Sequence, residues 1–258
     1  MLTGFSAPFT PGGRSSLVNP PPWHYAGWLL SVAYELDRSA AGAFLPGGFG
    51  TPTGTATMHF ADWQATTDGS ELVDPAYSQY KESFVVVDAE REGGLVGFCP
   101  LIYVDQDASL MRGWLMGLPK KLGSIWLTRS YPIEHPAAAP LAAGTTLGAS
   151  LAAKDHRLAE ARVALTGREG RRLGFLRLPT YGLLGLPTIV RGAPPSAPRL
   201  VRLAALATHG TYHEAIGSLD LLPAPRDELA ELRPIRVVDA AASYVALTIN
   251  DVAPAEGD

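Results

Sequence analysis

Apolar segments rich in β-branched and aromatic residues recur along nearly the whole chain, and turn residues separate them. The clearest is 84–88, which reads Phe-Val-Val-Val-Asp. Residues of these types are enriched in strands. We expect strands at 28–34, 55–65, 83–88, 96–104, 122–128, 161–165, 172–178, 200–208, 235–239 and 243–249. Many strands with few helices favour a mostly β, α+β fold with an antiparallel sheet that curls strongly or closes.

Two short helices are expected beside these strands. The first covers 37–44, where Asp37 is a suitable N-cap and the Pro-Gly-Gly turn at 46–48 ends the helix. The second covers 108–116 and leads directly into Pro119. A helix at that place would present Lys120 and Lys121, the two residues that follow Pro119.

The two ends of the chain differ from the segments between them. Residues 1–22 are rich in Gly, Pro and Ser and predict an N-terminal arm, and the polar residues 251–258 predict a mobile tail. We see no internal repeat and no convincing linker, so 1–258 is predicted to be a single domain. With 47% hydrophobic and 18% charged residues, the chain has enough apolar surface for a sizeable core.

Charge and composition exclude several classes of protein. The formal net charge of −4 gives no reason to expect nucleic acid or an anionic membrane as a partner. No apolar run approaches the roughly 20 residues of a membrane span, and no signal peptide is visible at the N-terminus. The single cysteine, Cys99, rules out an internal disulfide. We therefore expect a cytoplasmic enzyme, and a homo-oligomer.

Two adjacent lysines, Lys120 and Lys121, stand out because the chain has only two others, Lys81 and Lys154. The pair lies in an apolar segment, 114–123, whereas exposed lysine pairs usually lie in polar runs. Two ammonium groups held close in a dry site disfavour each other's protonated form. One of them then becomes a neutral amine, which can attack a carbonyl to form a Schiff base.

The segments around this pair resemble those of the acetoacetate decarboxylase family. Residues 119–123 match its Pro-Lys-Lys-Leu-Gly segment, and 80–83 match its Tyr-x-Glu-Ser segment, which carries an active-site glutamate. Residues 22–25, 33–37 and 100–105 resemble the strands that flank these motifs. The resemblance implies a closed or strongly curled antiparallel β-barrel or cone with peripheral helices and with the lysine pointing into its interior. Acetoacetate decarboxylase is itself the standard example of a lysine activated by a cationic neighbour.

Three departures from the family pattern bear on the reaction. Gly27 aligns with an arginine that handles the substrate carboxylate in decarboxylases, and Ala61 aligns with a second glutamate. Residues 112–114 read Arg-Gly-Trp where the family has Gly-Arg-Glu. This pattern is similar to the aldolase-dehydratase branch, whose members condense pyruvate with an aldehyde and eliminate water. Gly27 and Ala61 are expected to leave room for the second substrate.

The resemblance implies a role for each candidate catalytic residue. Lys120 would form the imine, and Lys121 would lower the pKa of Lys120 and attract the carboxylate of the 2-oxo acid. Glu82 or Tyr244 would act as the general acid or base. The imine is itself the electron sink, so no cofactor is expected.

Four further residues are candidates for binding the substrate, each with a plain structural alternative. Gln64 would hydrogen-bond the substrate or lie on the exterior of the sheet. Trp114 and Met116 would line the pocket or only pack in the core. Arg112 would pair with the substrate carboxylate or be a solvated surface arginine.

Two other functions stay open at this point. One is a β-keto acid decarboxylase that uses the same imine, and the other is a non-catalytic barrel whose lysines hold an anion. His209 and His213 have the i, i+4 spacing of a metal site on a helix, but the Gly-Thr that follows His209 argues against a helix. The expected partners are a small 2-oxo acid and an aldehyde.

Overall fold

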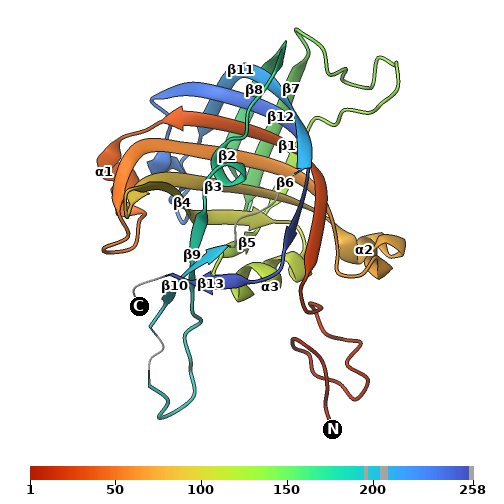
Figure 1. Ribbon diagram of the computed structural model, residues 1–258, viewed down its shortest axis with the longest axis vertical. Helices are drawn as coiled ribbons and strands as arrows, with labels where there is room; N and C mark the ends of the chain where they lie inside the picture. The colour runs from red at the N-terminus through yellow and green to blue at the C-terminus, as the bar shows by residue number, and fades with distance from the viewer. Residues whose placement is uncertain (195–196, 204–208, 256–258) are drawn as a thin grey trace.

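Thirteen strands form one continuous sheet in the computed structural model, which describes residues 1–194, 197–203 and 209–255 (Figure 1). The strands are β1 (Trp23–Glu35), β2 (Thr51–Thr66), β3 (Gln79–Arg91), β4 (Gly94–Val104), β5 (Lys120–Leu122), β6 (Ser124–Leu127), β7 (Thr146–Ala153), β8 (His156–Glu169), β9 (Thr180–Leu184), β10 (Arg199–Leu203), β11 (His209–Leu221), β12 (Arg236–Ile249) and β13 (Val252–Pro254).

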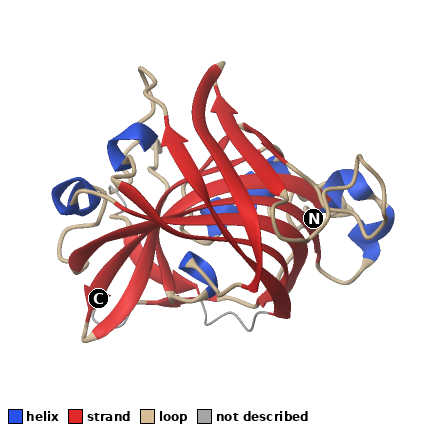
Figure 2. Ribbon diagram, turned by 90° about the horizontal axis from the view of Figure 1, so that it is seen from above, coloured by secondary structure: helices blue, strands red, loops and turns tan. Residues whose placement is uncertain are grey.

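The helices are short and flank the sheet (Figure 2). The α-helices are α1 (Arg38–Ala43), α2 (Pro75–Ser78) and α3 (Asp107–Leu115), and the 3₁₀ turns are η1 (Ser70–Val73), η2 (Gly174–Leu176) and η3 (Leu229–Leu232). Helix α1 forms where predicted, because the Asp37 carboxylate accepts a hydrogen bond from Ala40 N at 2.9 Å and so caps its first turn. Among the described residues, no helix is long and apolar enough to span a membrane.

The strands follow one path, β13-β10-β9-β4-β3-β2-β1-β12-β11-β8-β7-β6, and β5 joins the side of β4. Neighbours are antiparallel except β4–β5 and β4–β9, which are parallel. The fold is mostly β, as predicted. In the part of the chain that the structure describes, the path has two free ends at β13 and β6, so the alternative of a barrel closed by hydrogen bonds is not the observed arrangement.

The central strands are covered on both faces, and this double burial positions the site. One face of β1–β4 and β12 packs against β6–β8 in a large core that includes Tyr34, Met58 and Val85. The other face packs against α3, η2 and β10 in a second core that includes Leu29 and Phe84. Because successive strand residues point to opposite faces, each central strand contributes alternate residues to the two cores.

Several expected elements differ from the observed ones. The segment 172–178 is not a strand, because Gly174 has a left-handed φ of +51° and starts the turn η2. The expected strands 235–239 and 243–249 are one strand, β12, joined through three alanines. Strands β7, β9 and β11 were not predicted, and residues 204–208 of the expected strand 200–208 lie outside the described residues.

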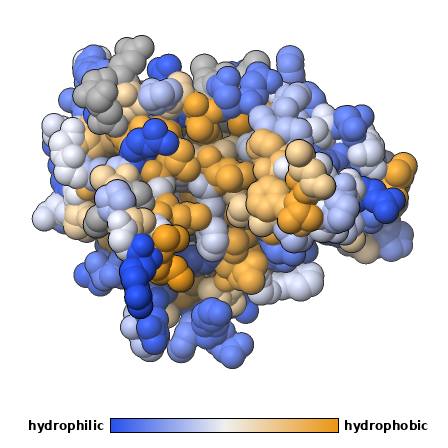
Figure 3. All heavy atoms as spheres, turned by 90° about the horizontal axis from the view of Figure 1, so that it is seen from below, coloured by the Kyte–Doolittle hydropathy of each residue, from blue (hydrophilic) through white to orange (hydrophobic). Residues whose placement is uncertain are grey.

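The two ends of the chain also differ from each other. The arm 1–22 contains one isolated bridge, between Thr3 and Thr10, and extends away from the sheet (Figure 1). The tail was expected to be mobile from residue 251, but Val252–Pro254 form β13 against β10, and Ala255 is buried. The face of the molecule that carries the arm is apolar across its middle (Figure 3).

Candidate active site

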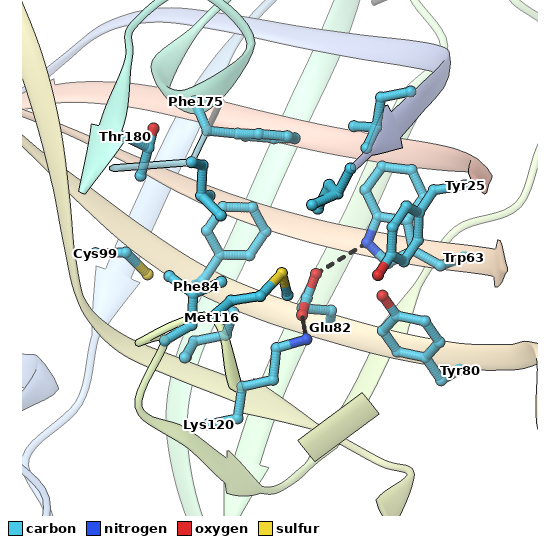
Figure 4. A pocket seen from close by; sticks show the side chains of 15 residues that line it. Tyr25, Trp63, Tyr80, Glu82, Phe84, Cys99, Met116, Lys120, Phe175 and Thr180 are labelled. Atoms are coloured by element: carbon cyan, nitrogen blue, oxygen red, sulfur yellow. Dashed lines mark hydrogen bonds and ion pairs between the residues drawn. The ribbon is translucent and has the colours of Figure 1, made fainter. Parts of the chain in front are cut away.

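A pocket lies in the second core, between the central strands and the segments that cover them, namely residues 116–120, η2 and β10 (Figure 4). Its wall is almost entirely apolar and aromatic, and Lys120 and Glu82 are the charged residues in it. The lining residues are Tyr25, Trp63, Tyr80, Glu82, Phe84, Cys99, Ile102, Met116, Leu118, Lys120, Phe175, Thr180, Leu203, Leu247 and Ile249.

Lys120 is 4% exposed and extends into this pocket from β5. Its Nζ lies 2.7 Å from Glu82 Oε1 and donates a hydrogen bond to Ser109 Oγ at 3.0 Å. Burial lowers the pKa of Lys120 below the ordinary value for a lysine. The Glu82 carboxylate raises that pKa, and the Arg112 guanidinium lowers it. Burial has the largest effect, so the neutral amine is available at lower pH than in an exposed lysine.

Glu82 is held in place by an indole from the neighbouring strand. Trp63 Nε1 donates to Glu82 Oε2 at 3.0 Å, which leaves Oε1 facing Lys120. The β2–β3 register puts Tyr80 opposite Trp63 and Glu82 opposite Ala61. Glu82 therefore lies between a fixed hydrogen-bond donor and the amine.

Arg112 is also buried, at 6% exposure, and stands between two aromatic rings. Its guanidinium carbon lies 5.6 Å from the ring centre of Tyr25 and 5.5 Å from that of Tyr80. Within the described residues, its Nε and Nη2 have no hydrogen-bond partner. A buried cation with unused donors is costly unless an anion joins it. Arg112 does not line the pocket of Lys120; it lines a neighbouring pocket, together with Val18, Trp23 and Glu71.

The two phenols beside Arg112 are neutral proton donors. Burial raises the pKa of Tyr25 to about 12 and raises that of Tyr80 well above its usual value. Both phenol oxygens lie on the side of the pocket that holds Glu82 (Figure 4). The pocket thus combines an amine, a carboxylate and two phenols in a dry space.

Lys121 lies on the opposite side of β5, because adjacent strand residues point to opposite faces. Its side chain is 43% exposed, and its Nζ lies 2.5 Å from Asp227 Oδ2. The two ammonium groups lie on opposite sides of β5, so the expected electrostatic repulsion between them within one dry site is not observed. The second cation near Lys120 is Arg112.

The sequence profile of the acetoacetate decarboxylase family matches residues 6–257. This chain belongs to the acetoacetate decarboxylase family.

Solved structures agree with this membership. The enduracididine biosynthesis enzyme MppR, in complex with the condensation product of pyruvate and imidazole 4-carboxaldehyde, is 30% identical, with a TM-score of 0.90 over 98% of this chain and 97% of that one. An acetoacetate decarboxylase-like enzyme from Sphingomonas wittichii RW1 is 25% identical, with a TM-score of 0.86 over 98% of this chain and all of that one. The acetoacetate decarboxylase of Legionella pneumophila, 20% identical with a TM-score of 0.71 over 92% and 88%, shares the fold. No curated protein sequence matches this chain significantly.

In this acetoacetate decarboxylase-family fold, strand alternation decides the position of two predicted site residues. Gln64 is exposed on β2, whereas its neighbour Trp63 lines the pocket. Tyr244 is 39% exposed, packs against Trp28, and donates to the Ser130 carbonyl at 2.5 Å. Both side chains lie on the face away from Lys120, so the structure does not bring them to the site.

The predicted site residues of α3 and of the turn after it differ in whether they line the pocket. Met116 lines the pocket. Trp114 is 38% exposed and does not line it, but its Nε1 donates to the Lys120 carbonyl at 3.0 Å and so fixes the backbone of the lysine. Arg112 is buried and not solvated.

The space expected over Gly27 is filled. A Cβ on Gly27 would lie 2.4 Å from Cε3 of Trp63 and 2.5 Å from the Asp62 carbonyl oxygen. Trp63 therefore occupies the volume in which an arginine at position 27 would extend. The small residue admits the indole that holds Glu82, and it does not leave room for a second substrate.

Several residues of the site were not predicted from the sequence, namely Tyr25, Trp63, Ser109 and Phe175. Tyr25 and Trp63 lie on the pocket face of β1 and β2. The alternation of strand residues between two faces could have indicated which residues share that face. Ser109 and Phe175 come from α3 and η2 and carry no local signal. His209 and His213 lie on β11, where four residues span roughly 13 Å, so they do not form a shared metal site.

Proposed function

We propose that this chain is a Schiff-base aldolase-dehydratase, which condenses pyruvate or a related 2-oxo acid with an aldehyde and eliminates water. The observation that carries the proposal is the Lys120 amine, buried in an apolar pocket and held by Glu82 and Ser109. The likeness to MppR, which binds pyruvate and a pyruvate–aldehyde condensation product, supports the choice of substrates.

The first step joins Lys120 to the ketone. A neutral amine has two N–H groups and one lone pair, and Glu82 and Ser109 accept the two N–H groups. The lone pair is then free to attack the ketone carbon, and a C–N bond forms. The ketone oxygen takes up one proton that the amine nitrogen loses and one proton from solvent, and it leaves as water, which gives the protonated imine.

The second step makes the carbon–carbon bond. The protonated imine draws electrons from the adjacent methyl group, and Glu82 removes one of its protons to give the enamine. The enamine carbon attacks the aldehyde carbon, which regenerates the imine. Glu82 returns the proton to the aldehyde oxygen, which becomes a hydroxyl group.

The third step eliminates that hydroxyl group. Glu82 removes one of the two protons that remain on the carbon next to the imine, and the hydroxyl group leaves as water with a proton from Glu82, Tyr25 or Tyr80. Tyr244 was considered for this role from the sequence, but its side chain lies on the face of β12 that points away from Lys120. Hydrolysis of the conjugated imine releases the unsaturated 2-oxo acid and restores the amine. The chemistry proceeds on the imine alone and requires no cofactor.

Arg112 is proposed to bind the substrate carboxylate. Its unused Nε and Nη2 donors and its positive charge suit an anion, and its guanidinium lies against the same tyrosine rings that line the pocket. In this proposal the carboxylate binds at the tyrosine side of the pocket. The carboxylate is retained in the product, so a fixed cation beside it does not hinder the reaction.

The test is incubation with pyruvate and a panel of aldehydes, followed by mass spectrometry of the products. Borohydride added to the pyruvate incubation should place the reduced adduct on Lys120, and Lys121→Gln should retain it. No adduct, or an adduct on Lys121, contradicts the proposal. An adduct without any condensation product would restrict the function to imine formation and favour the decarboxylase alternative.

A further inference from the structure

The two sides of the Lys120 pocket differ in polarity. The phenols of Tyr25 and Tyr80 lie on one side, and Phe84, Cys99 and Thr180 lie on the other (Figure 4). Burial raises the pKa of the Cys99 thiol, so the thiol stays neutral. The Thr180 hydroxyl already donates to a backbone carbonyl at 3.2 Å. The second side therefore suits an uncharged, apolar group.

The proposed imine would direct the second substrate to this apolar side. The imine carbon is trigonal and planar, so the carboxylate and the reacting methyl carbon diverge from it. With the carboxylate at the tyrosine side, the methyl carbon faces the apolar side. The aldehyde then reacts there, and its substituent lies among the apolar side chains.

Phe175 faces Lys120 across the pocket. Figure 4 shows the two side chains extending into the pocket from opposite sides. Phe175 belongs to η2, its side chain is half-buried, and its ring meets that of Phe84 edge-on with 5.2 Å between the ring centres. The space between the Phe175 ring and the imine therefore decides how large a substituent the aldehyde can carry.

The turn η2 lies directly on the buried imidazole of His59. A Cβ on Gly174, the first residue of η2, would lie 2.3 Å from His59 Nε2, so only glycine allows this approach. The His59 ring stacks on Phe84 at 4.7 Å and meets Phe175 at 5.0 Å between ring centres. His59 Nδ1 lies 2.8 Å from Ser31 Oγ, which fixes the imidazole. The Phe175 ring thus rests on two rings that are themselves buried.

Further interactions hold the other end of η2. Arg177 follows the turn, and its Nη2 lies 3.4 Å from Asp88 Oδ2 on β3. Gly97 N on β4 donates to the Pro179 carbonyl at 2.8 Å. Because η2 is joined to the sheet at both ends, Phe175 is a fixed part of the pocket wall.

We propose that Phe175 sets the size limit for the aldehyde, and that this substrate carries an uncharged, apolar substituent. Phe175 touches the substituent, whereas Gly174 and His59 are positioning residues that hold its ring. The inference rests on the proposed function for the identity of the substrate as an aldehyde. The size limit of the pocket itself can be measured without turnover.

Straight-chain aldehydes from acetaldehyde to octanal, each supplied with pyruvate, measure the limit during turnover. Product formation is followed by the ultraviolet absorbance of the conjugated 2-oxo acid. The readout is the chain length beyond which kcat/KM falls. It is determined within each variant, so a change in overall activity cancels. The variants are Phe175→Ala, Phe175→Leu and Phe175→Trp, and succinic semialdehyde is compared with butanal to test for charge.

We expect Phe175→Ala and Phe175→Leu to move the limit to longer chains and Phe175→Trp to move it to shorter ones. In Phe175→Ala, kcat/KM for the first aldehyde beyond the wild-type limit should rise about 10- to 200-fold relative to acetaldehyde. Succinic semialdehyde should react at least about 100-fold less efficiently than butanal, because its carboxylate would be buried without a partner. A limit that is the same in all three variants, or equal use of the two four-carbon aldehydes, would overturn the inference.

Gly174→Ala tests whether the contact with His59 positions Phe175. The added methyl group would meet the imidazole, so η2 must move away and carry Phe175 with it. The limit should then move to longer chains. Gly93→Ala is the matched control, because Gly93 also has a left-handed φ, +78° beside +51°, but a Cβ there meets no atom within 4 Å. An unmoved limit in Gly174→Ala, or an equal shift in Gly93→Ala, would contradict the positioning role.

A second measurement needs no turnover. Straight-chain primary amides from acetamide to octanamide are tested for protection of Lys120 against acetic anhydride, with peptide mapping. The longest amide that protects should change among the Phe175 variants in the same direction as the aldehyde limit. Condensation with a limit that Phe175 does not move would overturn this inference and leave the proposed function. A limit for amides that Phe175 moves, without any pyruvate adduct on Lys120, would overturn the proposed function and leave the role of Phe175 in the pocket.

Discussion

Glu82 has two opposing effects on Lys120, and they can be separated by substitution. Its charge and hydrogen bond raise the pKa of the amine, which burial lowers. Its carboxylate is also the proposed acid and base. In the proposed mechanism Glu82 therefore lowers the fraction of neutral amine and also carries the later proton transfers.

Glu82→Gln should lower the pKa of Lys120 further, because a nearby negative charge is removed. The acid limb of the pH profile for adduct formation then moves to lower pH. Turnover to the condensation product should fall about 10²- to 10⁴-fold, because the general acid–base group is lost. The measurement is adduct yield across pH beside product formation. A limb that moves to higher pH would show that the carboxylate does not stabilise the ammonium form.

His59 gives the fold a dependence on pH that is independent of catalysis. It is fully buried behind the pocket wall, where it stacks on Phe84, meets the edge of Phe175 and lies 2.8 Å from Ser31 Oγ. Burial lowers the pKa of His59 from 6.5 to about 3. At pH values between about 3 and 6.5, His59 is therefore protonated in the unfolded chain and neutral in the folded protein.

The free energy of unfolding should therefore fall as the pH drops from 6.5 towards 3, by at most about 1.4 kcal/mol per pH unit from this group. His59→Phe should lack this contribution. Urea unfolding of both proteins at several pH values gives the difference, in which the effects of other groups cancel. Parallel curves for the two proteins would mean that His59 is protonated in the folded state.

At the scale of the strand, alternation explains which parts of the site could be predicted. Lys120 and Glu82 belong to local motifs, and the structure brings both to the pocket. Gln64 was predicted in place of Trp63 because a polar side chain suggests a binding role, whereas the face on which a residue lies depends on the register of the sheet. The partner of Lys121 is 106 residues away, so no local pattern could indicate it.

Gly27→Ala tests how β1 and β2 hold Glu82. The added methyl group would meet Trp63, so the indole must move and Glu82 loses its donor. We expect a loss of about 1–3 kcal/mol in the free energy of unfolding and a change in tryptophan fluorescence. Gly47→Ala, which meets no atom within 4 Å, is the matched control. Combination with Trp63→Phe should recover part of the loss, because the two changes share one contact. Simple additivity would exclude that contact as the cause.

The sequence predicted the mostly β character of the fold but not the full course of the sheet. Strand β11 was missed because polar residues and glycines interrupt its apolar pattern, and β12 was split because alanine is a poor strand former. Burial between the neighbouring strands outweighs these propensities. The ends of the sheet depend on long-range pairing such as β10 with β13, and they could not be read locally. The homo-oligomer stays a prediction.

The residues of the whole pocket are expected to decide between decarboxylation and condensation. One comparison of the two reactions tests this expectation. With Trp63 over Gly27 and a methyl group at Ala61, the charged groups of a decarboxylase are absent from those positions. We expect very slow release of carbon dioxide from acetoacetate and faster condensation of pyruvate with an aldehyde. Parallel assays of carbon dioxide and of the ultraviolet absorbance of the conjugated 2-oxo acid decide between them. Rapid carbon dioxide release without condensation would assign the chain to the decarboxylases.

The alternation of Lys120 and Lys121 on β5 has a consequence for how this site can change. A strand that slips by one residue exchanges its two faces. Deletion of one residue from the turn before Pro119 would bring the amine of Lys121 to the depth that Lys120 now occupies, and would leave Leu122 opposite Asp227. The chain thus carries a second lysine whose amine a one-residue shift of β5 would bring into the pocket. A lineage that lost Lys120 could regain imine chemistry through a single deletion, without the need to evolve a new lysine.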